Sequence, residues 1–128
     1  GNISQIAETA ALVQGKMDIY SGNDDQIVPI LALGGLGVIS VLSNIMPAET
    51  ALLCDRFFRG DITGSAAMQL RFLPLIHALF SEVTPIPVKA ALAAMGYGEN
   101  YLRLPLTPME PAHEEKLLKL MRAEGIQV

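Results

Sequence analysis

Two segments of the chain end in small polar residues that could form a ligand site. Ser21-Gly22-Asn23 follows a short, mostly apolar run at residues 17–20, and Ile39-Ser40 lies in a second such run at residues 38–41. Short apolar runs bounded by Gly, Asn and Ser are typical of buried strands. A helical segment separates the two runs, and a strand–helix–strand unit brings both strand ends to one edge of a parallel sheet. The pattern therefore predicts a site at these two strand ends.

The two central residues of this site also have simpler interpretations. A glycine at position 22 allows the chain to turn without the steric penalty of a Cβ atom. Ile39 is an apolar residue of the kind that normally packs in a core. From the residues alone, turn formation by Gly22 and core packing by Ile39 are the alternatives to ligand binding.

Adjacent carboxylates at Asp24 and Asp25 follow the first strand end. Two carboxylates could act as general acid and base or could bind a metal ion. Successive side chains on a helix point about 100° apart, however, and no histidine lies nearby in the sequence. We therefore expect both residues to cap the helix predicted at residues 24–33, where carboxylates accept hydrogen bonds from free N–H groups.

Four other side chains could take part in chemistry. Lys89 lies in a mostly apolar run, where burial could favour the neutral amine that forms Schiff bases, although a packed stem with an exposed amine is the preferred interpretation. Cys54 follows apolar residues and is expected to be a small buried side chain. His77 lacks an identifiable partner and is expected in a core or interface, whereas His113 is expected to be exposed.

Apolar spacing, glycines and prolines predict a chain in two parts. Residues 1–60 are predicted to contain an outer helix, a strand at residues 17–20, a helix at residues 24–33, a strand at residues 38–41 and a helix at residues 48–59. Residues 61–128 are predicted to form a helical domain, with helices that begin at Ile62, Val88 and Pro111.

The overall composition argues against several classes of function. A formal charge of −4 and an isoelectric point near 5.0 do not suit nucleic-acid binding, which needs clustered Lys and Arg. Hydrophobic residues make up 51% of the chain, but Gly, Pro and charges interrupt each run before the roughly 18 residues of a membrane span. No Cys/His cluster suggests a metal, and Gly34-Gly35-Leu36-Gly37 lacks the spacing of a dinucleotide-binding loop. The single cysteine fits a reducing cytoplasm.

Three separated segments carry a family resemblance. They are Tyr20-Ser21-Gly22-Asn23-Asp24-Asp25 with residues 34–44, Pro85-Ile86-Pro87-Val88-Lys89-Ala90-Ala91-Leu92, and Leu102-Arg103-Leu104-Pro105-Leu106-Thr107-Pro108. Their order closely resembles the C-terminal part of the dihydrodipicolinate synthase family, within the superfamily of pyruvate-dependent aldolases and N-acetylneuraminate lyases. The resemblance implies a predominantly helical α/β fold: a partial TIM (β/α)8 barrel in residues 1–60, with its last two parallel strands, and a C-terminal helical domain in residues 61–128.

The resemblance also implies a function. Enzymes of this family condense pyruvate with aspartate semialdehyde in the diaminopimelate route to lysine. In the family, the main chain at the positions of Gly22 and Ile39 lines the pyruvate pocket, the latter through its carbonyl near a Schiff-base lysine. That lysine lies in a Lys-Glu-Ala segment closely followed by Gly-Asn, so a chain that begins Gly1-Asn2 is expected to lack it and the relay tyrosine. We therefore expect no catalytic residue, metal or cofactor in this chain, no activity of the chain alone, and a missing N-terminal half-barrel as its partner.

Two alternatives to this function stay open. The chain could be a non-catalytic helical interaction or oligomerisation module of the same ancestry, because its apolar content could bind a complementary half-barrel or a second copy. It could also be part of a sugar-acid or sialic-acid aldolase, since these enzymes share the barrel and the lysine chemistry. An incomplete sheet predicts self-association, and a homo-oligomer is expected.

Overall fold

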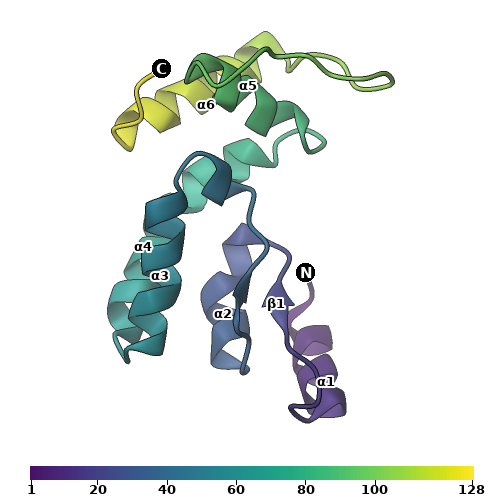
Figure 1. The fold of residues 1–128 in the computed structure, drawn as a ribbon, viewed down its shortest axis with the longest axis vertical. Coiled ribbons are helices and arrows are strands. Elements are labelled where there is room, and N and C mark those ends of the chain that lie inside the picture. Colours follow the sequence, from purple (N-terminus) through teal and green to yellow (C-terminus); the bar gives the residue numbers. More distant parts are fainter. The chain divides into compact units, whose positions relative to one another are not determined.

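A computed structural model describes all 128 residues of the chain (Figure 1). Contacts between residues divide the chain into two compact units, Gly1–Arg71 and Phe72–Val128. The division falls within one continuous helix, α4 (Ile62–Leu79). The domain border predicted after residue 60 is a different one, because it separates the barrel part from the C-terminal helical domain. It stays a prediction.

The first unit contains two short strands, with helices before, between and after them along the chain. Its elements are α1 (Ile3–Val13), β1 (Tyr20–Ser21), the 3₁₀ turn η1 (Asp24–Gln26), α2 (Ile27–Ala32), β2 (Gly37–Val38), the 3₁₀ turn η2 (Leu42–Asn44), α3 (Pro47–Phe58) and the first part of α4. Helix α1 begins at a capping residue, because the side chain of Asn2 accepts hydrogen bonds from the N–H groups of Ser4 (2.9 Å) and Gln5 (3.4 Å).

The two strands are parallel, as the sequence predicts, with Tyr20 opposite Gly37 and Ser21 opposite Val38. They are shorter than the strands predicted at residues 17–20 and 38–41. The sheet contains no third strand, and the hydrogen bonds next to the paired residues run from Leu36 N to Ile19 O and from Ile39 N to Ser21 O, both 2.8 Å. Pairing defines a strand, so apolar residues without a pairing partner stay outside it.

The helix predicted at residues 24–33 is also shorter. Residues 24–26 form η1, and regular α-helix covers only Ile27–Ala32. The prediction that Asp24 and Asp25 cap this helix is wrong. Asp24 bonds instead to N–H groups after β2, and Asp25 makes no side-chain hydrogen bond. The helix ends before Gly34, whose φ angle of 92° is one that glycine adopts without strain.

The core of the first unit centres on α2 and α3. Ile27, Leu31 and Leu53 are buried together, and partly buried apolar side chains from β2, α2, α3 and α4 pack against them. Helix α3 lies one residue earlier than the helix predicted at residues 48–59, because Pro47 suits the first helical position. The hydroxyl of Ser65 on α4 donates to the carbonyl of Leu53 at 2.8 Å.

The second unit contains only helices and connecting segments. It consists of the rest of α4, α5 (Ile86–Ala94) and α6 (Pro111–Ala123), and α5 packs against α6. Residues 95–110, which include the segment 102–108, form neither helix nor strand. The buried side chains are those of Phe72, Leu75, Ile76, Ala78, Leu79, Ile86, Pro87, Val88, Ala90, Ala91, Met109, Leu117 and Met121. No helix in the chain is both long enough and apolar enough to cross a membrane.

Candidate ligand site at the strand ends

The two predicted site residues lie on neighbouring strand ends. The N–H of Ile39 donates to the carbonyl of Ser21 at 2.8 Å, so Ile39 is held beside the peptide group that leads into Gly22. Gly22 is exposed, and Ile39 is 72% exposed, so the side chain of Ile39 does not pack in the core of this chain. The N–H and carbonyl of Gly22 and the carbonyl of Ile39 make no hydrogen bond within the chain. These main-chain groups are available to a ligand.

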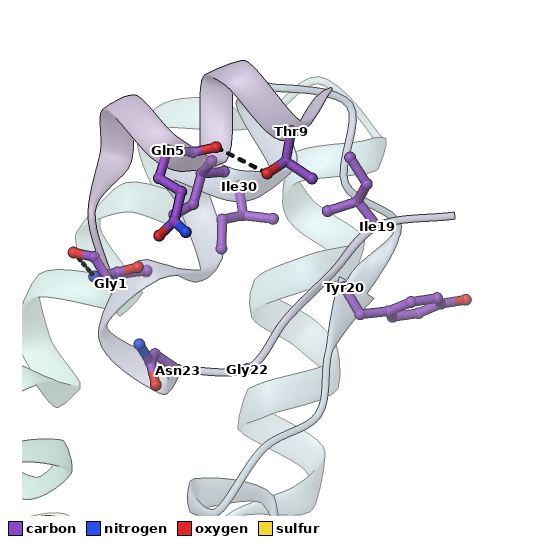
Figure 2. A pocket seen from close by; sticks show the side chains of 10 residues that line it. Gly1, Gln5, Thr9, Ile19, Tyr20, Gly22, Asn23 and Ile30 are labelled. Atoms are coloured by element: carbon purple, nitrogen blue, oxygen red, sulfur yellow. Dashed lines mark hydrogen bonds between the residues drawn. The ribbon is translucent and has the colours of Figure 1, made fainter. Parts of the chain in front are cut away.

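A cavity of about 250 Å³ adjoins Gly22. Figure 2 shows Gly22 and Asn23 on one side of this cavity and two residues of α1, Gln5 and Thr9, on the other. The hydroxyl of Thr9 donates to the carbonyl of Gln5 at 2.9 Å, so it is already used within the helix. No Asp, Glu, His, Lys, Arg or Cys side chain lines the cavity. The cavity therefore offers hydrogen-bonding groups of uncharged side chains and of the main chain at Gly22, whereas Ile39 does not line it.

Asp24 links the two strand ends, a role different from the helix cap that its position in the sequence predicts. Its side chain is 1% exposed. One carboxylate oxygen, Oδ2, accepts hydrogen bonds from the N–H groups of Val41 (2.9 Å) and Leu42 (3.0 Å), and Oδ1 accepts one from the hydroxyl of Ser40. Burying a carboxylate is costly unless several donors surround it, and this one has three. The sequence held a signal for this contact: a carboxylate just past one strand end and a serine just past the next.

A buried glutamine holds Asp24 from the opposite side. Gln69 on α4 is 6% exposed. Its Nε2 donates to the carbonyl of Asp24 at 2.7 Å, and its Oε1 accepts from the N–H of Val28 at 3.2 Å. Both groups of the side-chain amide are therefore satisfied inside the first unit. No local sequence pattern predicts this contact, because Gln69 lies 45 residues after Asp24.

The other candidate side chains show no arrangement for catalysis. Lys89 is half-buried on α5, and His77 on α4 is exposed, so a core position for His77 is wrong. His113 is exposed as predicted, and its Nδ1 lies 2.9 Å from Glu82 Oε2. Cys54 is half-buried, and the pKa of its thiol is raised by burial and, to a smaller degree, by the neighbouring Asp55 carboxylate. No group of three or more His, Cys, Asp or Glu side chains is placed to hold a metal ion.

Comparison with known proteins decides which family this arrangement belongs to. Residues 1–124 match the sequence model of the Dihydrodipicolinate synthetase family. The chain belongs to this family. Two curated family members, both named 4-hydroxy-tetrahydrodipicolinate synthase, illustrate the similarity. The protein of Lachnoclostridium phytofermentans is 55% identical over 125 residues, which are 98% of this chain and 42% of that protein. The protein of Caldicellulosiruptor bescii is 53% identical over 128 residues, which are 100% of this chain and 43% of that protein. The chain thus spans less than half the length of these relatives.

Solved structures of the family share the fold. The dihydrodipicolinate synthase of Thermotoga maritima superposes with a TM-score of 0.95 at 42% identity, over 98% of this chain and 43% of that one. The enzyme of Acinetobacter baumannii, solved in complex with pyruvate, gives a TM-score of 0.91 at 33% identity, over 98% of this chain and 43% of that one. These matches confirm the predicted fold: part of a TIM barrel with two parallel strands, followed by a C-terminal helical domain.

Proposed function

We propose that this chain supplies the C-terminal part of a synthase that condenses pyruvate with aspartate semialdehyde in lysine biosynthesis in the cytoplasm. One observation in particular supports this proposal. The N–H and carbonyl of Gly22 and the carbonyl of Ile39 are free of hydrogen bonds at two adjacent strand ends. The relatives of the chain are named 4-hydroxy-tetrahydrodipicolinate synthase. In TIM barrels, active sites lie at this end of the strands.

The proposed reaction divides its chemistry between this chain and the remaining part of the enzyme. A lysine amine from outside the chain attacks the pyruvate carbonyl and expels water, which gives a Schiff base. Loss of a methyl proton then gives an enamine, whose carbon attacks the aldehyde of the second substrate. The free N–H of Gly22 can donate to a pyruvate oxygen, and the carbonyl of Ile39 can accept from the protonated nitrogen. Groups fixed in advance in this way stabilise charge without a reorganisation cost.

The proposed partners follow from the incomplete sheet. Each of the two strands pairs only with the other, so each has one open edge. An open strand edge is a template for pairing with further strands. We propose that the remaining part of the barrel covers these edges in the complete enzyme, which is a homo-oligomer, and that the chain alone is inactive.

A chimera tests the proposed activity. In it, this chain replaces the segment that it matches in the Lachnoclostridium phytofermentans synthase. The chimera and the isolated chain are each incubated with pyruvate and borohydride, which reduces a Schiff base to a stable adduct, and the intact mass is measured. We expect one adduct per chimera and none on the isolated chain. A folded chimera without an adduct would contradict the proposal. An adduct on the isolated chain would assign the reactive lysine to Lys16, Lys89, Lys116 or Lys119.

Substitution of Gly22 tests the pyruvate pocket itself. A Cβ atom added at Gly22 meets no atom of the chain within 4 Å, and Gly22 does not have a positive φ angle. We therefore expect Gly22→Ala in the chimera to raise the KM for pyruvate and to leave the melting temperature unchanged. Gly125→Ala is the control, because its φ of 83° should lower the melting temperature without changing KM. The pocket role is wrong if Gly22→Ala leaves KM unchanged.

A further inference from the structure

The peptide group of Ile39 is held on both sides by polar contacts. On its N-terminal side, the N–H of Ile39 is bound to Ser21 O. On its C-terminal side, the hydroxyl of Ser40 accepts from the N–H of Ser43 at 2.8 Å, and the hydroxyl of Ser43 donates to the carbonyl of Ser40 at 3.0 Å. The turn that follows Ile39 is therefore closed by side chains as well as by main-chain hydrogen bonds.

Asp24 connects this turn to the other strand end. It follows Gly22 by two residues, and its carboxylate binds Ser40, Val41 and Leu42, the three residues directly after Ile39. Gln69 fixes the main chain of Asp24 in turn. We call these contacts of Asp24 with residues 40–42 the Asp24 clasp. The clasp joins the main chain near the free N–H of Gly22 to the main chain near the free carbonyl of Ile39.

The burial of Asp24 argues against a direct role in chemistry. Its side chain is 1% exposed, and both carboxylate oxygens already accept hydrogen bonds from donors of the chain. A general acid or base must come within hydrogen-bond reach of the substrate, which an enclosed carboxylate does not do. A ligand at the strand ends therefore contacts the main chain that Asp24 holds, and does not contact Asp24.

We propose that Asp24 is a positioning residue, which fixes the carbonyl of Ile39 relative to Gly22 for the reaction of bound pyruvate. This inference rests on the proposed function. Catalytic groups must lie close to their productive geometry, and a displacement of about 1 Å can cost on the order of a hundredfold in rate. The clasp supplies that geometry through two main-chain hydrogen bonds and one hydroxyl contact, without exposing a charge to the ligand.

The test uses the chimera with three substitutions. Asp24→Asn keeps the size of the side chain but removes its charge and one acceptor oxygen. Ser40→Ala removes only the hydroxyl contact and is the milder change. Asp25→Asn is the matched control, because it makes the same charge change at the next residue, which is exposed and makes no side-chain hydrogen bond. For each variant, kcat is expressed per site that borohydride traps with pyruvate, and KM and the melting temperature are also measured.

We expect Asp24→Asn to lower kcat per trapped site by roughly ten- to a hundredfold. Ser40→Ala should cause a smaller fall, and Asp25→Asn should match the parent chimera. A purely structural role would lower the melting temperature or the number of trapped sites, and would leave kcat per trapped site unchanged. Hydrogen exchange at the N–H groups of Val41 and Leu42 should become faster in Asp24→Asn and stay unchanged in Asp25→Asn.

The outcomes separate this inference from the proposed function. A parent chimera that folds but traps no pyruvate overturns both the synthase proposal and the positioning role. An active parent with equal kcat per trapped site in Asp24→Asn and Asp25→Asn overturns the positioning role alone. If Asp24→Asn does not fold, Ser40→Ala decides, because unchanged kcat per trapped site in that variant also overturns the role.

Discussion

The two units of the chain differ in what they bury. All five buried polar or charged residues belong to residues 1–71, and none belongs to residues 72–128. They are Ser21, Asp24, Thr50, Ser65 and Gln69. In the second unit every fully buried residue is apolar, although the unit has nearly as many buried positions, and its enclosed polar atoms belong to partly buried side chains such as Asn100 and Glu124. The same chain thus stabilises one unit partly through hydrogen bonds of fully buried side chains, and the other mainly through apolar packing with polar contacts nearer the surface.

This difference indicates where geometry is fixed most closely. Apolar packing is tolerant, because side chains of similar size and shape can replace one another at modest cost. A buried polar group is not tolerant, since it must keep a partner in the right place or lose a full desolvation penalty. The first unit carries such groups beside the strand ends, where Gly22 and Ile39 present free main-chain atoms. Polar burial therefore coincides with the candidate site.

The largest expected effect comes from the apolar cores, and it compares the units directly. Leu53 in the first unit and Leu117 in the second are both 0% exposed. Replacing either by Ala in the chimera should cost about 2–5 kcal/mol in the free energy of unfolding, measured in urea. Only Leu53→Ala should also lower activity, because Leu53 packs with Ile27 directly after η1. An equal loss of activity in Leu117→Ala would show that the second unit also shapes the site.

Sequence reasoning found the local features of the fold. Asn2 was predicted to start a helix and does so, and the order of two parallel strands around one helix followed from apolar runs and glycines. It failed where the partner of a residue lies far along the chain. Strand length depends on which residues find a pairing partner, and the contact of Gln69 with Asp24 spans 45 residues. Neither can be predicted from local spacing.

The candidate site shows the same limit. The family resemblance predicts Gly22 and Ile39 as site residues, and the structure adds that they lie at adjacent strand ends with free main-chain groups. Their contact with pyruvate stays a prediction. The sequence predicts that Asp24 caps its own helix, because that helix offers the nearest free N–H groups along the chain. The N–H groups that it binds instead belong to Val41 and Leu42, which follow the next strand and lie close in space but far along the sequence.

A second prediction concerns the polar burial of the first unit. Gln69→Met keeps a side chain of similar length but leaves the carbonyl of Asp24 and the N–H of Val28 without this partner. We expect a loss of about 1–3 kcal/mol in the free energy of unfolding of the chimera. Gln127→Met is the control, since Gln127 is exposed near the end of the chain. If both variants are equally stable, buried hydrogen bonds do not distinguish the first unit.

The polar contact of the second unit should have a smaller effect. Glu82 Oε2 accepts from the N–H of Glu110 at 3.1 Å and lies 2.9 Å from His113 Nδ1. The side chains of His113 and Glu82 are 49% and 18% exposed, so water reaches this contact from the His113 side, and ion pairs that water reaches are weak. We expect Glu82→Gln to cost less than about 1 kcal/mol in thermal unfolding of the chimera. Glu115→Gln, an exposed carboxylate on the same helix as His113, serves as the control. A cost larger than that of Gln69→Met would reverse the comparison of the units.

The smallest expected effect concerns Cys54, a half-buried thiol of the first unit. Burial, and to a lesser extent the carboxylate of Asp55, raises the pKa of this thiol. A smaller fraction of Cys54 is therefore ionised near neutral pH than in the unfolded chain, and the thiolate is the reactive form. We expect iodoacetamide to alkylate Cys54 of the folded chimera more slowly than in urea, with the pH dependence displaced to higher pH. Mass spectrometry of the peptide that contains Cys54 measures this rate.

The direction of the effect on stability follows from the same pKa shift. The folded state holds the thiol proton more tightly than the unfolded state, so the stabilisation is fully present below the unfolded pKa of about 8.5. It is lost as the pH rises through the raised pKa of the folded state. Ionisation of Cys54 should therefore not make the free energy of unfolding depend on pH near neutrality. Asp55→Asn should move the alkylation curve only part of the way to that in urea, because burial is the larger cause. If the alkylation curve of Asp55→Asn instead matches that in urea, Asp55 and not burial is the main cause of the raised pKa. The contrast between Asp24, whose burial three hydrogen-bond donors compensate, and Cys54, whose burial nothing compensates, would then be lost.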